Sequence, residues 1–143
     1  MPAGRNIKFH SIDLDFLPKN PTFISEWLNS AILKEGMRPG NLEISFMSDD
    51  ALLKINQEHL NHDFFTDIIT FEYNEDEILS GDILISVDRV RENANKFQVN
   101  FTDELHRVMI HGVLHLCGYK DKTEAEQLNM SAKEDYYLSL RSF

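Results

Sequence analysis

Two histidines, a glycine and an aspartate lie close together in the segment His111–Asp121, which reads HGVLHLCGYKD. His111 and His115 are four residues apart, so on a helix they would share one face, and each could give a ring nitrogen to the same metal ion. Gly118 is suited to end such a helix, because glycine adopts the left-handed conformation that a sharp exit requires. The turn after Gly118 can then carry Asp121 back towards both histidines.

The resulting H-x3-H-x5-D set offers three protein ligands and leaves a fourth position open, as in catalytic rather than structural zinc sites. We therefore expect one divalent ion per chain, with Zn²⁺ as the favoured metal, on His111, His115 and Asp121. The two histidines would be catalytic through that ion. For the histidine pair alone, an ordinary surface or core role is the simpler interpretation, and the positions of Gly118 and Asp121 favour the metal.

The same spacing resembles the H-E-x-x-H-x-x-G-x-x-H pattern of the metzincin proteases, with two changes. Gly112 stands where those proteases have the glutamate that takes a proton from water, and Asp121 stands where they have a third histidine. Because glycine carries no base, the sequence keeps the residues that bind a metal and lacks the one needed for peptide cleavage.

Strands and helices that could position these residues alternate along the chain. Apolar alternation and β-branched residues predict strands over residues 6–11, 42–46, 66–73 and 81–87. Apolar periodicity and capping residues predict helices over residues 21–35, 48–60, 89–97 and 103–117, and from 123 towards the C-terminus. The strand over 81–87 is almost continuously apolar and should be central. This order predicts a single α+β (α/β-like) domain over residues 1–143, with about four strands, about five helices and a metzincin-like metal site on one helix.

Composition narrows the classes of function. With 143 residues, 42% apolar and 10% aromatic, the chain can bury a core without disulfides, and its single cysteine, Cys117, fits a reducing cytoplasm. No apolar run reaches the ~20 residues of a membrane span, and Met1–His10 contains no apolar secretory segment, so we expect a cytoplasmic protein. The net charge of −10 disfavours general nucleic-acid binding and leaves room for a local basic groove.

Four ordered segments resemble the YbeY family of bacterial endoribonucleases and rRNA maturation factors. The segment His111–Asp121 is similar to the family's H-G-x-L-H-L-x-G-Y-D-H, and Thr66–Phe71 (TDIITF) is similar to its P-T-D-V-L-S-F. Gly81–Ser86 (GDILIS) resembles G-D-I-x-I-S, and Met130 with Glu134 matches M-x-x-x-E. The resemblance extends from about residue 56 to residue 137.

The resemblance implies a single-domain metalloprotein with a mixed sheet and a metal, usually zinc, on His111, His115 and residue 121. It implies a single-strand-specific endoribonuclease that acts in ribosome biogenesis and in maturation of the 16S rRNA 3′ end. Its expected partners are rRNA and the small ribosomal subunit or its assembly factors, and neither DNA nor a membrane is expected. The candidate RNA-contacting residues are Arg89, Arg91 and Arg107, which flank the metal segment in sequence, and Glu134 is a candidate partner for a ligand imidazole.

Three positions depart from the family pattern. Asp121 replaces a histidine, Phe65 replaces a proline, and Leu60 stands where the family has an arginine suited to bind phosphate. Two alternatives follow from these departures and from the acidic charge. The protein is either a metal-stabilised, non-catalytic factor associated with the ribosome, or a metal-dependent hydrolase of another substrate.

Overall fold

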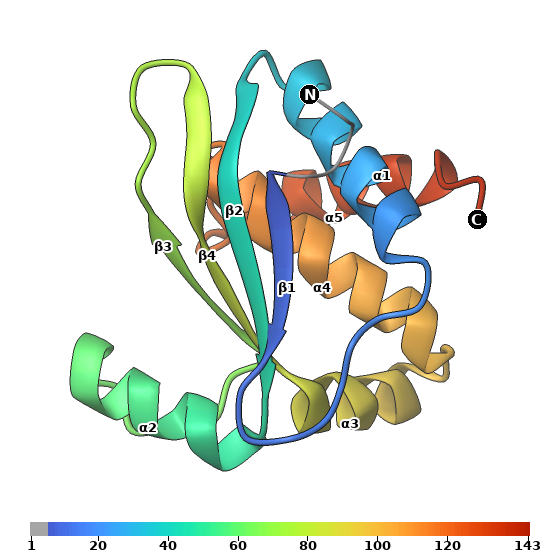
Figure 1. Ribbon diagram of the computed structural model, residues 1–143. Helices are drawn as coiled ribbons and strands as arrows, with labels where there is room; N and C mark the ends of the chain where they lie inside the picture. Colours follow the sequence, from blue (N-terminus) through green and yellow to red (C-terminus); the bar gives the residue numbers. More distant parts are fainter. Residues whose placement is uncertain (1–5) are drawn as a thin grey trace.

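The computed structural model describes residues 6–143 (Figure 1). Part of the stretch Met1–His10, in which no secretory segment is expected, lies outside the described residues. The elements follow in the order β1 (Ile7–Ser11), α1 (Pro21–Lys34), β2 (Arg38–Met47), α2 (Asp49–Leu60), β3 (Ile68–Glu72), β4 (Ile78–Ser86), α3 (Val87–Phe97), α4 (Phe101–Leu116) and α5 (Glu124–Ser139). This confirms the prediction of an α+β fold with four strands and five helices. Within residues 6–143, no helix is long and apolar enough to span a membrane.

The four strands form one mixed sheet in the order β1-β2-β4-β3. β1 and β2 are parallel, as are β2 and β4, whereas β3 runs antiparallel to β4. The predicted central position of β4 is therefore confirmed. β2 and β4 are both longer than their sequence patterns predict, because Arg38 pairs with Ile78 across a bulge that the local apolar alternation does not show.

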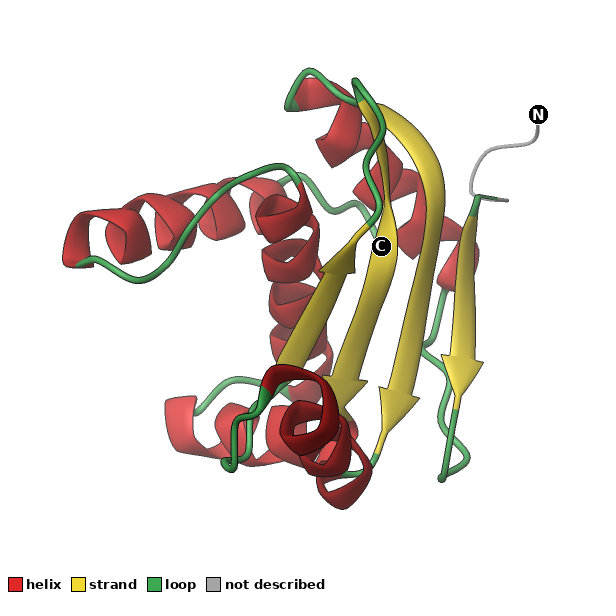
Figure 2. Ribbon diagram, turned by 90° about the vertical axis from the view of Figure 1, so that its left-hand side faces the viewer, coloured by secondary structure: helices red, strands yellow, loops and turns green. Residues whose placement is uncertain are grey.

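Helices cover both faces of the sheet. Successive strand residues point to opposite faces, and both faces carry apolar side chains on which helices pack. On one face, Ile44 and Ile83 belong to the main core, on which α1 and α4 pack. On the other face, Leu52 of α2 packs on Met47 and Ile69. Figure 2 shows α2 in front of the lower end of the sheet and α4 running behind it.

The ends of α4 and α5 are set by local sequence. Asn100 caps α4, since its side chain accepts a hydrogen bond from the backbone N–H of Asp103, so the helix starts slightly earlier than predicted. Gly118 follows its other end with a φ of 108°, a left-handed conformation that suits glycine. The predicted capping box of Thr123 and Glu126 begins α5. These two helices hold most of the candidate site.

Gly112 lies where α4 packs closely on the sheet. A Cβ atom at this position would be 2.8 Å from Cδ1 of Ile68 and 3.1 Å from the Ile83 side chain. The missing side chain thus allows α4 to approach β3 and β4, while the neighbouring residue His111 lines a pocket from another face of the helix. The position that carries the base in metzincins is a packing position here.

Candidate metal centre

The structure brings together the three predicted metal ligands. His111 and His115 lie on the last two turns of α4, with their ring centroids 4.6 Å apart. The loop after Gly118 returns Asp121 to them, so that its Oδ2 lies 3.3 Å from Nε2 of His111 and 3.2 Å from Nε2 of His115. One ligand atom from each residue can be chosen so that all three lie within 4.8 Å of one another. The three residues could therefore hold one metal ion.

The separations fit the size of a small divalent cation. Zinc bonds of about 2.0–2.2 Å in a tetrahedral arrangement place neighbouring ligand atoms about 3.3–3.6 Å apart. The distances from the Asp121 carboxylate to the imidazole nitrogens, 3.3 Å and 3.2 Å, lie at the short end of that range. The three side chains are also between 22% and 39% exposed, so solvent or a substrate can reach this group from one side.

Both imidazoles are held through the nitrogen that faces away from Asp121. The Nδ1 atom of His115 lies 2.9 Å from the carbonyl oxygen of Tyr119, which can only accept a hydrogen bond, so this contact is a hydrogen bond when Nδ1 carries the proton. The Nδ1 atom of His111 lies 2.6 Å from Oε2 of Glu134, a carboxylate that is only 8% exposed. In this tautomer each Nε2 lone pair is available to a metal.

Glu134 joins the two helices of the site. Its Oε1 accepts a hydrogen bond at 2.9 Å from Arg107, whose guanidinium also contacts Asp135 at 2.6 Å. Burial lowers the pKa of His111, but the hydrogen bond and charge of Glu134, with smaller contributions from two aspartates, outweigh burial and raise the pKa overall. Glu134 therefore has the position expected of a partner that orients a ligand imidazole.

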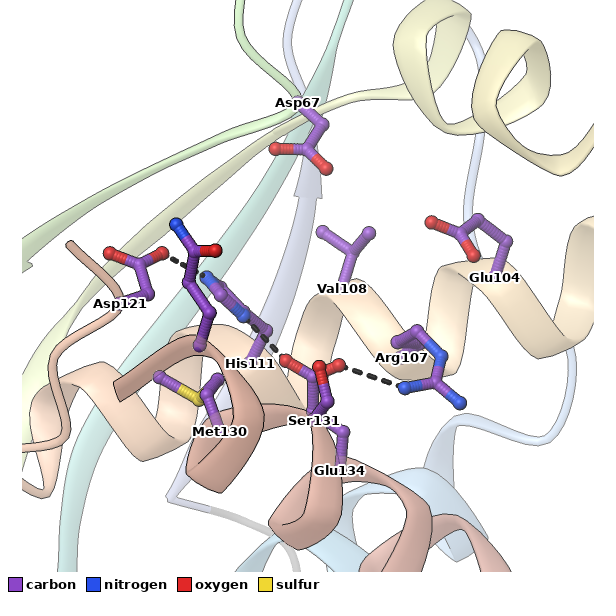
Figure 3. A pocket seen from close by; sticks show the side chains of 10 residues that line it. Asp67, Glu104, Arg107, Val108, His111, Asp121, Met130, Ser131 and Glu134 are labelled. Carbon is purple, nitrogen blue, oxygen red and sulfur yellow. Dashed lines mark hydrogen bonds and ion pairs between the residues drawn. The ribbon is translucent and has the colours of Figure 1, made fainter. Parts of the chain in front are cut away.

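A pocket of about 380 Å³ opens beside His111, between α4 and α5 (Figure 3). His111, Asp121 and Glu134 line it, together with the carboxyl groups of Asp67 and Glu104. Burial raises the pKa of both of these last carboxyls. The pocket is therefore rich in acidic groups.

The three candidate RNA-contacting arginines occupy different environments. Arg107 lines the pocket, with its guanidinium paired to Glu134 and Asp135. Arg89 pairs with Asp49 of α2 at 2.6 Å, and the Arg91 guanidinium lies 5.0 Å from the centre of the Phe101 ring. Of the three, the structure brings only Arg107 to the pocket, and RNA contact by any of them stays a prediction.

Sequence reasoning missed four groups at the site, namely the side chains of Glu104, Gln127 and Ser131 and the carbonyl of Tyr119. Glu104 was not singled out, although it precedes His111 by seven residues, which is two turns along the same helix face. The role of the Tyr119 backbone carbonyl could not be recognised in the sequence, because every residue has such a carbonyl. Leu60, at the end of α2, is 39% exposed and is not among the residues that line the pocket.

The fold and the site define a class of protein. Its members have a mixed four-stranded sheet, a helix that carries a His-x3-His pair, and a carboxylate from the turn after that helix. The model of the family described as Endoribonuclease YbeY matches residues 8–141. The chain therefore belongs to the YbeY family, as its motifs indicate.

Individual relatives agree with this assignment. A protein of Flavobacterium psychrophilum named Endoribonuclease YbeY is 50% identical over 128 residues, which cover 90% of this chain and 91% of that protein. One of the same name from Amoebophilus asiaticus is 45% identical over 139 residues, which cover 96% and 94%. A solution structure of a Thermotoga maritima protein superimposes with a TM-score of 0.61 and 28% identity, covering 93% of this chain and 87% of that one.

Proposed function

We propose that this protein is a metal-dependent endoribonuclease that cleaves single-stranded RNA in ribosome biogenesis, including maturation of the 16S rRNA 3′ end. Membership of the YbeY family and the name of its relatives support the reaction class. The observation that carries the proposal is the convergence of two Nε2 atoms and one carboxylate oxygen, with both Nδ1 atoms bonded elsewhere.

The proposed ligands are His111, His115 and Asp121, and the proposed ion is one Zn²⁺ per chain. A divalent cation bound by these residues would supply Lewis-acid chemistry, acidifying water and neutralising charge on a phosphate. The two histidines act through that ion, and Glu134 keeps His111 in the correct tautomer and orientation. We propose that residues 1–143 act as one hydrolase domain.

The pocket is where RNA would meet the ligand group. Arg107 on its wall offsets the negative charge of Glu134, which lowers the repulsion that a phosphate would meet there. Arg89 and Arg91 are proposed to contact RNA further along α3, beyond the pocket. The proposed partners are rRNA and the small ribosomal subunit or its assembly factors, in the cytoplasm.

A non-catalytic, metal-stabilised role in the ribosome is the second candidate. The observation in its favour is that the guanidiniums of Arg89 and Arg107 are paired with carboxylates, while Leu60 replaces the family's arginine. In that case the metal would bind and RNA would stay intact, so both properties have to be measured on the same sample.

The test compares wild type with His115→Ala and Asp121→Ala for metal content and for cleavage of single-stranded rRNA segments. We expect about one metal ion per wild-type chain, and we expect both variants to lose the metal and the cleavage. His10→Ala serves as a matched control, because His10 lies on β1, pairs with Glu43 and is absent from the pocket. Identical RNA products from wild type and His115→Ala would contradict the nuclease proposal. Metal binding without cleavage would support the non-catalytic role.

A further inference from the structure

Glu35 is a nearly buried carboxylate that lies outside the pocket, at the C-terminal end of α1. Its side chain is only 8% exposed. It accepts hydrogen bonds from the hydroxyl of Tyr119 at 2.6 Å, from Nζ of Lys133 at 3.1 Å and from the hydroxyl of Tyr137. These donors come from two segments, the turn after α4 and the middle of α5, that each hold one acceptor for a ligand histidine.

The first segment is the turn that holds His115. Tyr119 donates its backbone N–H to the carbonyl of Leu114 at 3.0 Å, and its hydroxyl donates to Glu35. The peptide at residue 119 is thus fixed by its backbone and by its side chain. Its carbonyl oxygen is the group that accepts the hydrogen bond from Nδ1 of His115.

The second segment is the turn of α5 that holds His111. Lys133 and Tyr137 are four residues apart on one face of α5, and both donate to Glu35. Tyr137 is 1% exposed, and its carbonyl accepts a further hydrogen bond from the Trp27 indole at 2.8 Å. Glu134, which holds Nδ1 of His111, lies between these two anchored residues in sequence.

The charge of the cluster fits an anchor that stays ionised. Burial alone would raise the pKa of Glu35, but the hydrogen bonds from the two tyrosines and the lysine outweigh it and lower the pKa overall. Burial and the hydrogen bond to Glu35 raise the pKa of Tyr137, so its hydroxyl keeps its proton and remains a donor. A buried charge is a costly way to gain stability, because well-packed apolar residues often do as well. Its directional hydrogen bonds can instead fix the orientation of both segments.

We propose that Glu35 is a positioning residue for the metal centre, which orients His115 through Tyr119 and His111 through the Glu134 turn of α5. The proposal rests on the proposed metal-dependent function, because it assigns Glu35 a role in preparing the ligands. Glu35 touches neither histidine. It acts through Tyr119 and Tyr137, which lie 84 and 102 positions further along the chain.

The test uses Glu35→Gln and Tyr119→Phe, which change the hydrogen bonding of the cluster with little change in shape and leave the residue 119 carbonyl in place. Zn²⁺ affinity is measured by competition with a chelator, and the His115 tautomer in the metal-free protein is measured by ¹⁵N NMR. Removing a direct partner of a metal-bound histidine costs about 10–100-fold in affinity, so this more distant change should weaken Zn²⁺ binding about 3–10-fold. Both variants should also move His115 away from a single Nδ1–H tautomer.

Tyr136→Phe is the matched control, because Tyr136 is 48% exposed on the same helix and is not among the donors to Glu35. The double variant Glu35→Gln/Tyr119→Phe should weaken binding by less than the product of the two single effects, since both changes break one connection. A lower melting temperature with wild-type Zn²⁺ affinity and an unchanged tautomer would overturn the proposal and leave Glu35 with a purely structural role. If wild type itself failed to bind Zn²⁺, the proposed metal centre would be wrong, and the tautomer measurement would still decide the role of Glu35.

Discussion

Asp121 changes the charge of the ligand set at the scale of a single residue. Two neutral imidazoles and one carboxylate would leave a divalent ion with a formal charge of +1, whereas three imidazoles would leave it at +2. We therefore expect a weaker Lewis acid than with the family's third histidine, and a smaller preference for zinc over manganese or iron. The distances from Asp121 to both histidine nitrogens show that the shorter side chain still reaches them.

Glu134 provides a prediction at the same scale. Glu134→Gln removes the charge that favours a protonated Nδ1 on His111 while keeping most of the shape of the side chain. We expect Zn²⁺ affinity to fall about 10–100-fold, as for other direct partners of metal-bound histidines. Chelator competition measures the change.

Asp135→Asn is the control for this variant, because Asp135 also pairs with Arg107 but is 67% exposed and does not contact His111. It should leave Zn²⁺ affinity within about twofold of wild type, since exposed ion pairs contribute little. Equal effects of the two substitutions would show that general loss of negative charge, rather than the hydrogen bond to His111, is responsible.

At the scale of elements, the packing of α4 on the sheet limits which side chain position 112 can hold. Gly112→Glu would restore the metzincin-like sequence H-E-x-x-H, but its side chain would point at Ile68 and Ile83 rather than into the pocket. Burying a carboxylate between helix and sheet should destabilise the protein by at least about 3 kcal/mol and create no protease activity. Chemical denaturation and a peptide-cleavage assay test both expectations.

Asn129→Glu is a suitable comparison, since it adds the same charge at an exposed position of α5 and should change stability by less than about 0.5 kcal/mol. Gly112→Ala should stay within about 1 kcal/mol of wild type, because the gain in helix propensity offsets a small displacement of the isoleucine side chains. A stable Gly112→Glu protein would mean that α4 can move away from the sheet, against the packing described above.

At the scale of the whole molecule, His106 couples stability to pH. It is 4% exposed, it packs against Trp27 and Phe143, and Arg141 donates to its Nδ1 at 2.7 Å. Burial and the Arg141 charge lower its pKa to about 4, against the opposing effect of Asp103. His106 therefore stays neutral in the folded protein at a pH where the unfolded chain already binds a proton.

The direction of the pH effect follows from proton binding. Between pH 6.5 and about 4 the unfolded state holds more protons at this residue, so stability falls as pH falls, by about 2–3 kcal/mol over the whole interval. His106→Asn keeps an acceptor for Arg141 and cannot titrate, so the metal-free variant should lose this part of the slope. Urea denaturation at several pH values measures it, and His62→Asn, on an exposed loop, should keep the wild-type slope. An unchanged slope in His106→Asn would show that other groups cause the pH dependence.

Local sequence was enough to predict much of the fold and the grouping of the candidate metal ligands. The capping box of Thr123, the glycine after α4 and the alternation in β2 each reflect interactions within a few residues, which is why they can be recognised without a structure. The proximity of His111 and His115 on α4 was predictable for the same reason, since helix geometry alone puts residues four apart on one face.

The surroundings of the ligands were decided by the tertiary structure. Glu134 meets His111 across 23 residues of chain, and Glu35 meets Tyr119 across 84. The pairing of Arg89 with Asp49 likewise required two separate helices to pack together. A sequence determines which side chains share a turn or a helix face, because the covalent chain fixes those distances. Contacts between distant segments depend on how the helices pack on the sheet, so only the folded structure shows which carboxylate holds which histidine.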